Sequence, residues 1–258
     1  MSLSKSKAQP GIVASTGGAD DAARKFDPGR AAEYEQQSRI ALAGYDACHE
    51  LTACMLAAAL GSGGQARLLV AGAGGGAREI LTAGALEPGW SFTAVDPSPP
   101  MMDLAVARLT ESGLNDRTEI MIGTVSDLPS CQPFDAATLI GVLHHLQGDA
   151  AKRAILTAIA ERLKPGAPLV LAGNHQAYAS QPLMLAAWGE RWRQQGSTAE
   201  EIEAKRGKIL QGADPPHSED AVAALLHASG FGQPTRFFSS LFWGAWLARR
   251  RTDAEGGA

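Results

Sequence analysis

Glycines at positions 72, 74, 75 and 76 directly follow a short apolar run, and a lone acid, Asp96, ends the next apolar run. Glycine lets the backbone turn sharply and approach a ligand closely. An acid about 20 residues beyond such a loop is placed to bind both hydroxyls of a ribose. The residue types and their spacing therefore predict a nucleotide-binding site on a strand–loop–helix–strand unit.

Three histidines follow predicted strands and are candidates for a catalytic group. His144 and His145 come after the apolar run at 135–140, and His175 follows the run at 167–172. Ligands of open α/β sheets bind at the carboxyl ends of the strands, and histidine exchanges protons near neutral pH. A general base is one interpretation of these residues, and bonding to backbone groups is the other.

Strand-like and helical patterns alternate along the part of the chain that must position these residues. Strands are expected at 67–72, 91–96, 118–122, 135–140 and 167–172, and helices at 76–85, 99–112 and 149–163. This alternation predicts an α/β fold with a largely parallel sheet. A helix at 218–229 and two β-like runs, 234–239 and 241–249, are expected to close the chain.

The composition predicts one folded domain between two tails. Residues 1–25 and 251–258 are polar and lack periodicity, which is typical of disordered segments. We expect a single domain at 26–250, with an N-terminal helical cap at 26–60 and a helical insertion at 178–211. Asp27 is placed to cap the first helix, and Gly44 predicts a break. The aromatic residues of these helices either line an acceptor pocket or pack in the core: Tyr34, Tyr45, Tyr178, Trp188 and Trp192.

Charge and cysteine usage narrow the class of protein. The net charge of −4 shows no basic excess, so a nucleic-acid partner is not favoured. Cys48, Cys54 and Cys131 have neither zinc-site spacing nor the pattern of a disulfide framework. The sequence has no apolar run of about 18 residues and no signal-peptide core. We therefore expect a cytoplasmic protein with no membrane span and no bound metal.

Six motifs between residues 67 and 172 resemble the consecutive motifs of class I S-adenosylmethionine (SAM)-dependent methyltransferases. They are Val70-Ala-Gly-Ala-Gly-Gly-Gly, Val95-Asp-Pro-Ser-Pro-Pro-Met, Gly123-Thr-Val-Ser-Asp-Leu-Pro, Phe134-Asp-Ala-Ala-Thr-Leu-Ile, Leu143-His-His-Leu and Leu163-Lys-Pro-Gly-Ala-Pro-Leu-Val-Leu. The resemblance implies a Rossmann-like sheet, mostly parallel with its last strand antiparallel. It also implies a methyltransferase that uses SAM, releases S-adenosylhomocysteine (SAH) and acts on a small-molecule acceptor.

The same resemblance assigns cofactor contacts residue by residue. Gly72, Ala73 and Gly74 would lie along the methionyl part and the ribose of SAM. Asp96 would accept hydrogen bonds from both ribose hydroxyls. The other implied contacts are Pro97 and Met101 near the adenine, Thr124 and Val125 at its edge, and Ile140 beside the amino-acid part.

The chain departs from the family pattern at two positions. The family usually has an acid where this chain has Val70, and often an acid where it has Thr124. Of the three usual acids only Asp96 remains. Weaker SAM binding, backbone contacts and a changed ligand are all open interpretations. The missing acids also motivate one alternative function, a non-catalytic protein that binds SAM or SAH.

The flanking segments resemble the carboxy-SAM synthase-like family of tRNA modification. The segments are Phe26-Asp, Ala41-Leu-Ala-Gly-Tyr45, Glu201-Ile-Glu-Ala-Lys-Arg206 and residues 217–231. In that family a tyrosine contacts the ligand, and an arginine pairs with the ligand carboxylate across a subunit contact. By position these are Tyr45 and Arg206, which implies a homodimer and a second alternative function. Ile140 stands where that family has an asparagine, and Arg206 is also spaced to pair with Glu203 on its own helix.

An NAD-dependent oxidoreductase is the most distant interpretation. The spacing Gly72-x-Gly74-x-x-Ala77 also satisfies a dinucleotide fingerprint. However, the chain has one mononucleotide-binding half and a short remainder, instead of two complete halves.

Overall fold

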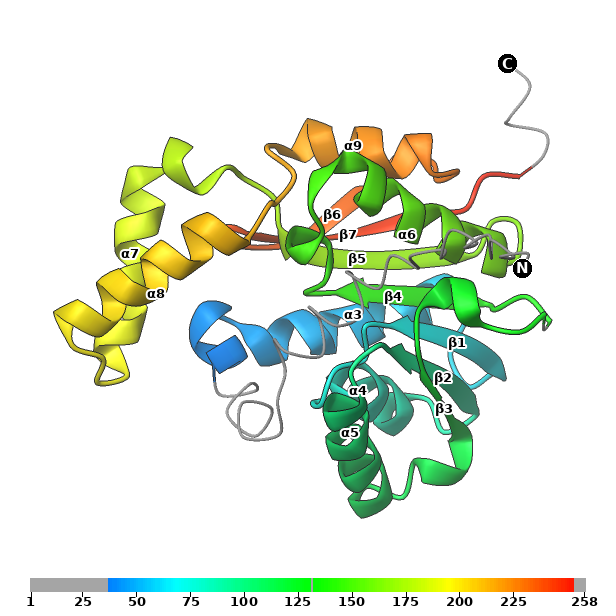
Figure 1. The fold of residues 1–258 in the computed structure, drawn as a ribbon. Helices are drawn as coiled ribbons and strands as arrows, with labels where there is room; N and C mark the ends of the chain where they lie inside the picture. The colour runs from blue at the N-terminus through cyan, green and yellow to red at the C-terminus, as the bar shows by residue number, and fades with distance from the viewer. Residues whose placement is uncertain (1–36, 131, 253–258) are drawn as a thin grey trace, which may run out of the picture.

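The computed structural model describes residues 37–130 and 132–252. Seven strands form one sheet in the order β3-β2-β1-β4-β5-β7-β6 (Figure 1). They are β1 Ala66–Ala71, β2 Trp90–Asp96, β3 Thr118–Ile122, β4 Ala136–Ile140, β5 Pro168–Asn174, β6 Thr235–Ser240 and β7 Trp243–Arg249. Strands β1 to β5 pair in parallel, and β7 is antiparallel to both of its neighbours. The predicted mostly parallel sheet with an antiparallel last strand is confirmed.

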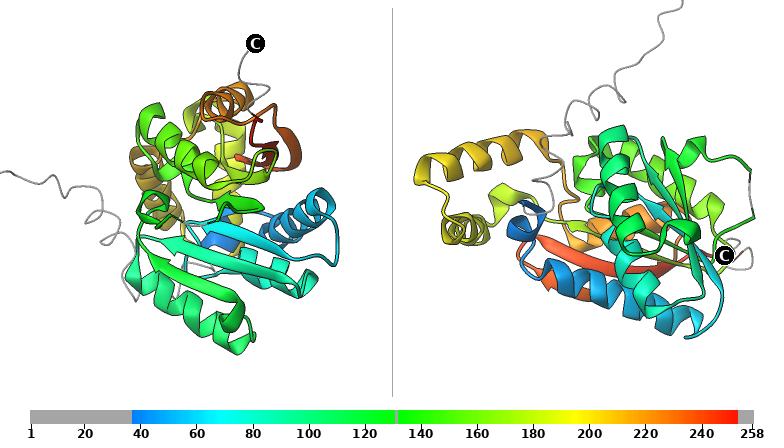
Figure 2. Two further views of the ribbon diagram at one scale, coloured as in Figure 1. Left: turned by 90° about the vertical axis from the view of Figure 1, so that its right-hand side faces the viewer. Right: turned by 90° about the horizontal axis from the view of Figure 1, so that it is seen from below.

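Alternate residues of β1 pack on opposite faces of the sheet. Leu68 and Val70 contact the apolar cluster that contains α3 (Tyr45–Leu60), α4 (Arg78–Leu86) and α5 (Pro99–Glu111). Leu69 and Ala71 contact the cluster that contains α6 (Gly148–Arg162) and α9 (Glu219–Ala228). Figures 1 and 2 show these helices on the two sides of the sheet. Because both faces of the central strands are covered, their sequences are apolar without alternation.

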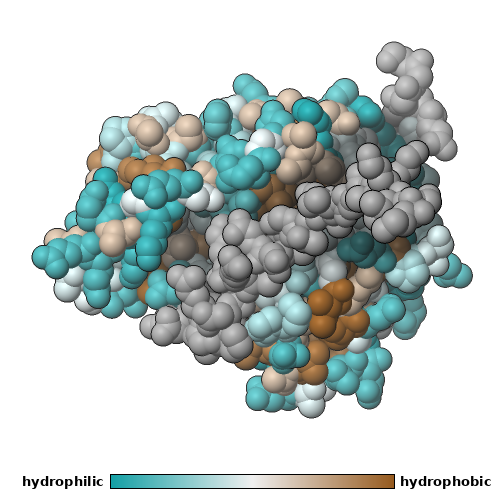
Figure 3. All heavy atoms as spheres, in the orientation of Figure 1, coloured by the Kyte–Doolittle hydropathy of each residue, from teal (hydrophilic) through white to brown (hydrophobic). Residues whose placement is uncertain are grey.

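Helices α7 (Pro182–Gln194) and α8 (Ala199–Gly212) form a hairpin that projects from one end of the sheet (Figure 2). The helical insertion is predicted to start at residue 178, but its first α-helix begins at Pro182, after the short 3₁₀ helix η4 (Tyr178–Ser180). Proline fits the first turn of a helix, whereas within a helix its ring clashes with the preceding turn. Figure 3 shows a largely hydrophilic surface over this hairpin.

The hairpin is attached to the N-terminal helical segment by buried aromatic residues. Trp188 and Trp192 stack with ring centroids 5.1 Å apart, and Trp188 Nε1 donates to the carbonyl of Ala41 at 2.8 Å. The predicted break at Gly44 is present, because residues 37–41 are helical and α3 begins at Tyr45. The predictions for residues 1–36, which include Asp27 and Tyr34, and for residues 253–258 lie outside the described residues.

The described residues contain neither a membrane-crossing helix nor a cluster of metal-ligating side chains. None of the helices at 37–130 and 132–252 is long and apolar enough to cross a bilayer. In the same residues, no three or more His, Cys, Asp or Glu side chains gather as they do around a metal ion.

Candidate ligand-binding site

The glycine loop after β1 is held against the end of β2. The N–H of Gly72 donates to the carbonyl of Val95 at 2.8 Å, and the N–H of Gly74 donates to Oδ2 of Asp96 at 3.0 Å. Gly72 has φ +69°, and a Cβ at this position would lie 2.3 Å from Cγ2 of Val142. Glycine is therefore needed at position 72 both for its backbone conformation and for the close approach of the loop that follows β4.

Asp96 accepts two backbone hydrogen bonds and keeps capacity for more. Its Oδ1 accepts from the N–H of Ser98 at 2.9 Å, and its Oδ2 accepts from Gly74. Each carboxylate oxygen can accept a second hydrogen bond, so the side chain can also bind a diol. Burial raises the pKa of Asp96, and the two backbone donors partly oppose this effect. The glycine cradle and the remaining acceptor sites fit the predicted ribose contact of SAM.

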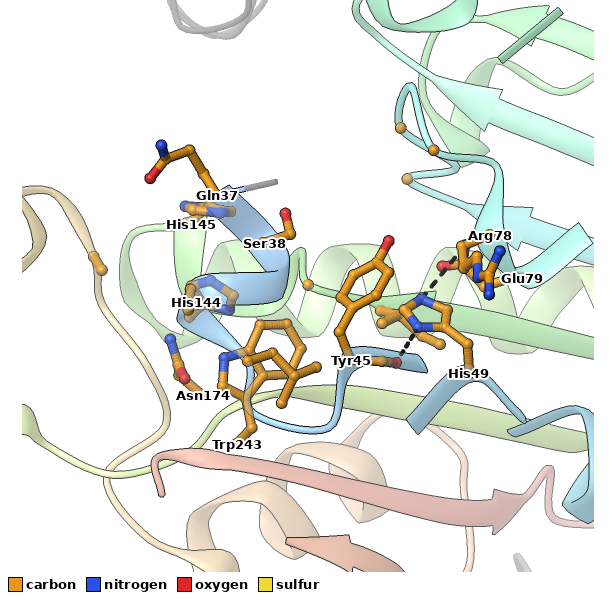
Figure 4. Close-up of a pocket in the computed structure, with 18 of the residues that line it drawn as sticks. Gln37, Ser38, Tyr45, His49, Arg78, Glu79, His144, His145, Asn174 and Trp243 are labelled. Carbon is orange, nitrogen blue, oxygen red and sulfur yellow. Dashed lines mark hydrogen bonds and ion pairs between the residues drawn. The ribbon is translucent and has the colours of Figure 1, made fainter. Parts of the chain in front are cut away.

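A cavity of about 240 Å³ opens beside the glycine loop. One wall is formed by the loop and by the first residues of α3 and α4, and the other by the segments after β4 and β5 (Figure 4). The residues that line the cavity include Tyr45, His49, Gly72, Ala73, Gly74, Arg78, Glu79, Ile140, His144, His145, Asn174, Tyr178, Trp188 and Trp243.

The predicted cofactor contacts divide between the cavity and its surroundings. Tyr45, Gly72, Ala73, Gly74 and Ile140 line the cavity. The other five do not line it and lie at or after the carboxyl ends of β2 and β3. These two strand ends are joined by a hydrogen bond from the N–H of Gly123 to the carbonyl of Asp96 at 3.0 Å. These five are Asp96, Pro97, Met101, Thr124 and Val125. The enclosed space thus coincides with the residues predicted for the methionyl half of the ligand.

The two positions without the usual acids have other roles in the structure. Val70 is buried in the apolar cluster beneath α3 and α4. The hydroxyl of Thr124 donates to Oδ2 of Asp127 at 2.7 Å, at the start of the 3₁₀ helix η2 (Val125–Asp127). This bond lowers the pKa of Asp127. Neither Val70 nor Thr124 offers a carboxylate to a ligand.

The sequence analysis missed an acid and a histidine on the cavity wall. Nδ1 of His49 lies 2.8 Å from the carbonyl of Tyr45, and Nε2 of His49 lies 4.0 Å from Oε2 of Glu79. Burial lowers the pKa of His49 to about 4 and raises the pKa of Glu79 to about 7. A usable signal was present, because His49 is one helical turn after Tyr45, and Glu79 is in the first turn after the glycine loop.

The opposite wall is aromatic and carries the histidine pair. His144 is buried and His145 is exposed, both in the 3₁₀ helix η3 (Leu143–His145). Asn174 ends β5, and its Nδ2 donates to the hydroxyl of Tyr178 at 2.7 Å. Oδ1 of Asn174 and Nε1 of Trp243 are buried and have no hydrogen-bond partner among the residues that the structure describes. The wall therefore contains one acceptor atom and one donor atom that are unpaired among the described residues. Sequence analysis did not single out either residue.

Three other predicted residues are not among those that line the cavity. Nδ1 of His175 donates to the carbonyl of Phe242 at 2.9 Å, and its ring packs against Trp246. Trp192 is buried behind Trp188. Arg206 lies 3.5 Å from Glu203 on the same helix, although Ile209, which is three residues further on, does line the cavity.

Comparison with known proteins agrees with this arrangement. Residues 69–169 match the family model described as "Methyltransferase domain". The chain is 33% identical over 129 residues to the ubiquinone biosynthesis O-methyltransferase of Xylella fastidiosa strain 9a5c, which covers 49% of this chain and 48% of that protein. It is 36% identical over 108 residues to the mitochondrial ubiquinone biosynthesis O-methyltransferase of Schizosaccharomyces pombe. That match covers 41% of this chain and 36% of the relative. The chain thus spans about half the length of the Xylella relative. It spans 36% of the length of the Schizosaccharomyces relative.

Solved structures share the fold. Human N-acetylserotonin methyltransferase in complex with SAM has a TM-score of 0.58 at 16% identity, over 88% of this chain and 57% of that one. Mitomycin 7-O-methyltransferase has a TM-score of 0.57 at 21% identity, over 89% and 62%. Over residues 69–169 the chain is similar to a methyltransferase domain, and its sheet has the fold that these methyltransferase structures share.

Proposed function

We propose that this chain is a SAM-dependent methyltransferase that acts on a hydroxyl group of a small molecule. The observation that carries the proposal is the glycine loop bonded to Asp96, next to a cavity that reaches the His144–Asn174 wall. The family match and the O-methyltransferase relatives support both the reaction class and oxygen as the acceptor atom.

The residues of the chain would contribute mainly alignment. Bound SAM supplies a methyl group that its sulfonium makes electrophilic. Gly72, Gly74 and Asp96 fix the position of the cofactor, and proximity to a second bound molecule lowers the barrier. His144 and His145 are our candidates to accept the proton of the attacking hydroxyl, because both line the cavity on the side away from the glycine loop.

The acceptor side favours a flat and mostly apolar molecule. Tyr178, Trp188 and Trp243 present ring surfaces to the cavity, and such rings pack well against another aromatic ring. Oδ1 of Asn174 and Nε1 of Trp243 can bind one polar group each. A hydroxylated aromatic compound combines both properties.

The two alternatives have less support. Carboxy-SAM synthesis has less support because Ile140 stands where that family has an asparagine, and Arg206 pairs with Glu203 on its own helix. A non-catalytic SAM-binding protein would not need a histidine pair and open polar atoms on the second wall of the cavity.

Ligand binding to the purified protein tests the proposal. SAM and SAH should raise the unfolding temperature, whereas NADH should not, because a ligand that binds only the folded state stabilises it. Incubation with methyl-labelled SAM and a panel of phenols should then give a labelled product. Stabilisation by NADH without a response to SAH would contradict the proposal. Carboxy-SAM found by native mass spectrometry of the purified protein would favour the second alternative.

We also propose that the protein is a cytoplasmic homodimer. Cys48 and Cys54 are free thiols, which suits a reducing compartment. Leu183 on α7 is 82% exposed, and a partner subunit would bury it. Light scattering after size-exclusion chromatography should give twice the chain mass, and Leu183→Glu should give the monomer mass.

A further inference from the structure

Glu79 and His49 form a buried pair on the wall of the cavity. Both side chains line it, and their exposed fractions are 7% and 3%. Glu79 is in the first turn of α4, directly after the glycine loop, and His49 reaches it from α3. Figure 4 shows His49 beside Tyr45, with Glu79 and Arg78 next to it. Because acids are rarely buried to this extent, the position of Glu79 beside a ligand cavity requires an explanation.

The hydrogen bonding of His49 leaves Glu79 without a donor from this ring. A carbonyl oxygen can only accept, so Nδ1 of His49 carries the proton donated to Tyr45. In the neutral ring, Nε2 then presents a lone pair toward Glu79. A lone pair that faces a carboxylate is unfavourable, and protonation of Glu79 relieves this repulsion. The free protein therefore holds one exchangeable proton at this pair.

The wall also carries a cationic group next to the acid. Arg78 lines the cavity, its Nη2 donates to Oδ1 of Asp46 at 3.0 Å, and its buried Nε has no hydrogen-bond partner among the described residues. Arg78 and Glu79 thus present a donor and an acid side by side. This combination is complementary to the carboxylate and ammonium groups at the amino-acid end of SAM.

We propose that Glu79 binds the α-ammonium group of SAM, in place of the acid absent at Val70, and releases its proton to solvent when the ligand enters. The inference rests on the proposed function. Before binding, the proton is on the Glu79 carboxyl. After binding, the carboxylate and Nε2 of His49 accept hydrogen bonds from the ammonium. No covalent bond to the ligand forms or breaks.

Several charged or titratable groups face Glu79 and affect this proton. His49 and Cys48 approach it from α3, Asp96 approaches it from β2, and Arg78 precedes it on α4. The Asp96 carboxylate disfavours ionisation of Glu79, and burial has the larger effect in the same direction. The entry of a cation reverses this balance, because the ammonium favours the ionised carboxyl.

The first test compares two ligands that differ only at the amino-acid end. SAH carries the ammonium group, and 5′-methylthioadenosine lacks the whole amino-acid end. Glu79→Gln should weaken SAH binding about tenfold or more, and it should change methylthioadenosine binding less than about twofold. Glu50→Gln, an exposed change on α3, is the matched control and should alter neither affinity. Equal losses for both ligands, or no loss for SAH, would overturn the role of Glu79.

The second test uses the unmodified protein and does not depend on how a variant folds. Calorimetric titration at about pH 6, where Glu79 with a pKa of about 7 is protonated, is run in two buffers of different ionisation enthalpy. The α-amino group of SAH is also protonated at that pH. SAH binding should release close to one proton, and methylthioadenosine binding should release none. Binding of SAH without proton release would overturn the proton exchange. If neither ligand binds, the proposed function itself fails.

Discussion

The backbone N–H of Gly74 donates to Oδ2 of Asp96 at 3.0 Å, so one carboxylate connects the loop after β1 to the end of β2. The second oxygen of Asp96 accepts from Ser98 at the start of α5. The acid that we expect at the ribose of the cofactor therefore also holds the glycine loop in shape. Loss of the Asp96 side chain would remove the expected ribose contact and would also release the glycine loop from the end of β2.

Asp96→Ala should weaken binding of SAH and of methylthioadenosine alike, because both contain the ribose. The expected loss is about 2 kcal/mol or more, since two backbone donors lose their acceptor and the ligand loses charge-assisted hydrogen bonds. Titration calorimetry of both ligands measures it. Asp103→Ala, an exposed change on α5, is the control. Retained affinity for either ligand would contradict the ribose role.

Gly72→Ala should destabilise the protein more than Gly113→Ala does. The two glycines have nearly the same φ, +69° and +68°, so a side chain has a similar conformational cost of about 1 kcal/mol at both positions. Only at position 72 would the new Cβ meet another atom, Cγ2 of Val142 at 2.3 Å. Overpacking adds about 1–3 kcal/mol. Urea unfolding of both variants measures the difference, and equal values would mean that the loop adjusts without strain.

Val142→Ala provides a further check on that clash. In the Gly72→Ala background it should recover part of the stability, because it removes the methyl group in contact. Added to Gly113→Ala, it should give no recovery.

Much of the fold could be predicted from the sequence, because the signals for it are local. The strand predicted at 91–96 lies at Trp90–Asp96, and the strand predicted at 118–122 lies at Thr118–Ile122. The first is an apolar run that is buried on both faces and ends at an acid, and the second is a short β-branched run that ends at a glycine. The predicted start of this helical region was wrong. The residues around 178 are apolar enough for a helix, but the first turn of α7 is set by Pro182.

The candidate site was only partly predictable, because its cavity joins distant segments. The glycine loop and Asp96 share one continuous motif. His49 and Asn174 meet the same cavity from α3 and from the end of β5, and no local pattern connects these positions. His175 is adjacent to Asn174, yet strand alternation turns its ring toward Trp246.

The stability of the ligand-free protein should depend on Glu79 between about pH 4.5 and about pH 7. Burial raises the pKa of Glu79 from 4.5 to about 7, so in this range the unfolded chain is ionised and the folded protein holds a proton. This group therefore makes the free energy of unfolding fall as pH rises, by at most about 1.4 kcal/mol per pH unit. The loss is complete above about pH 7.

Glu79→Gln should remove this contribution, because glutamine does not titrate. Denaturant unfolding at several pH values should show the variant gaining stability relative to the unmodified protein as pH rises through this range. His49, whose pKa is lowered to about 4, contributes in the opposite sense below about pH 6.5 and contacts Glu79, so the same comparison is made in a His49→Gln background. A constant difference between the two proteins would contradict the raised pKa of Glu79.

Asp214→Ala should destabilise the protein by about 2–3 kcal/mol. Nζ of Lys152 is bonded to Oδ2 of Asp214 at 2.6 Å, and Lys152 is only 1% exposed. Removal of the acid leaves a buried cation without its partner, which is costly even though Asp214 itself is partly exposed. Glu190→Ala, which breaks an exposed pair with Arg193, is the control and should cost less than about 1 kcal/mol. Similar losses for both variants would mean that burial of Lys152 adds nothing.

His144→Asn and His145→Asn should separate catalysis from cofactor binding once an acceptor has been found. A general base contributes about 10²–10⁴-fold to a rate, so replacing the one that accepts the hydroxyl proton should slow methyl transfer by about 10²-fold or more. SAH affinity should stay unchanged, because neither histidine is among the predicted cofactor contacts. Single-turnover rates with labelled SAM measure the chemical step without product release.

His227→Asn, at the C-terminal end of α9 beside Arg251, is the control for both histidine variants. A phenol ionised at high pH should restore the rate of the base variant, since no proton then has to leave. If both variants retain full rates at neutral pH, the methyl transfer proceeds without a base from η3.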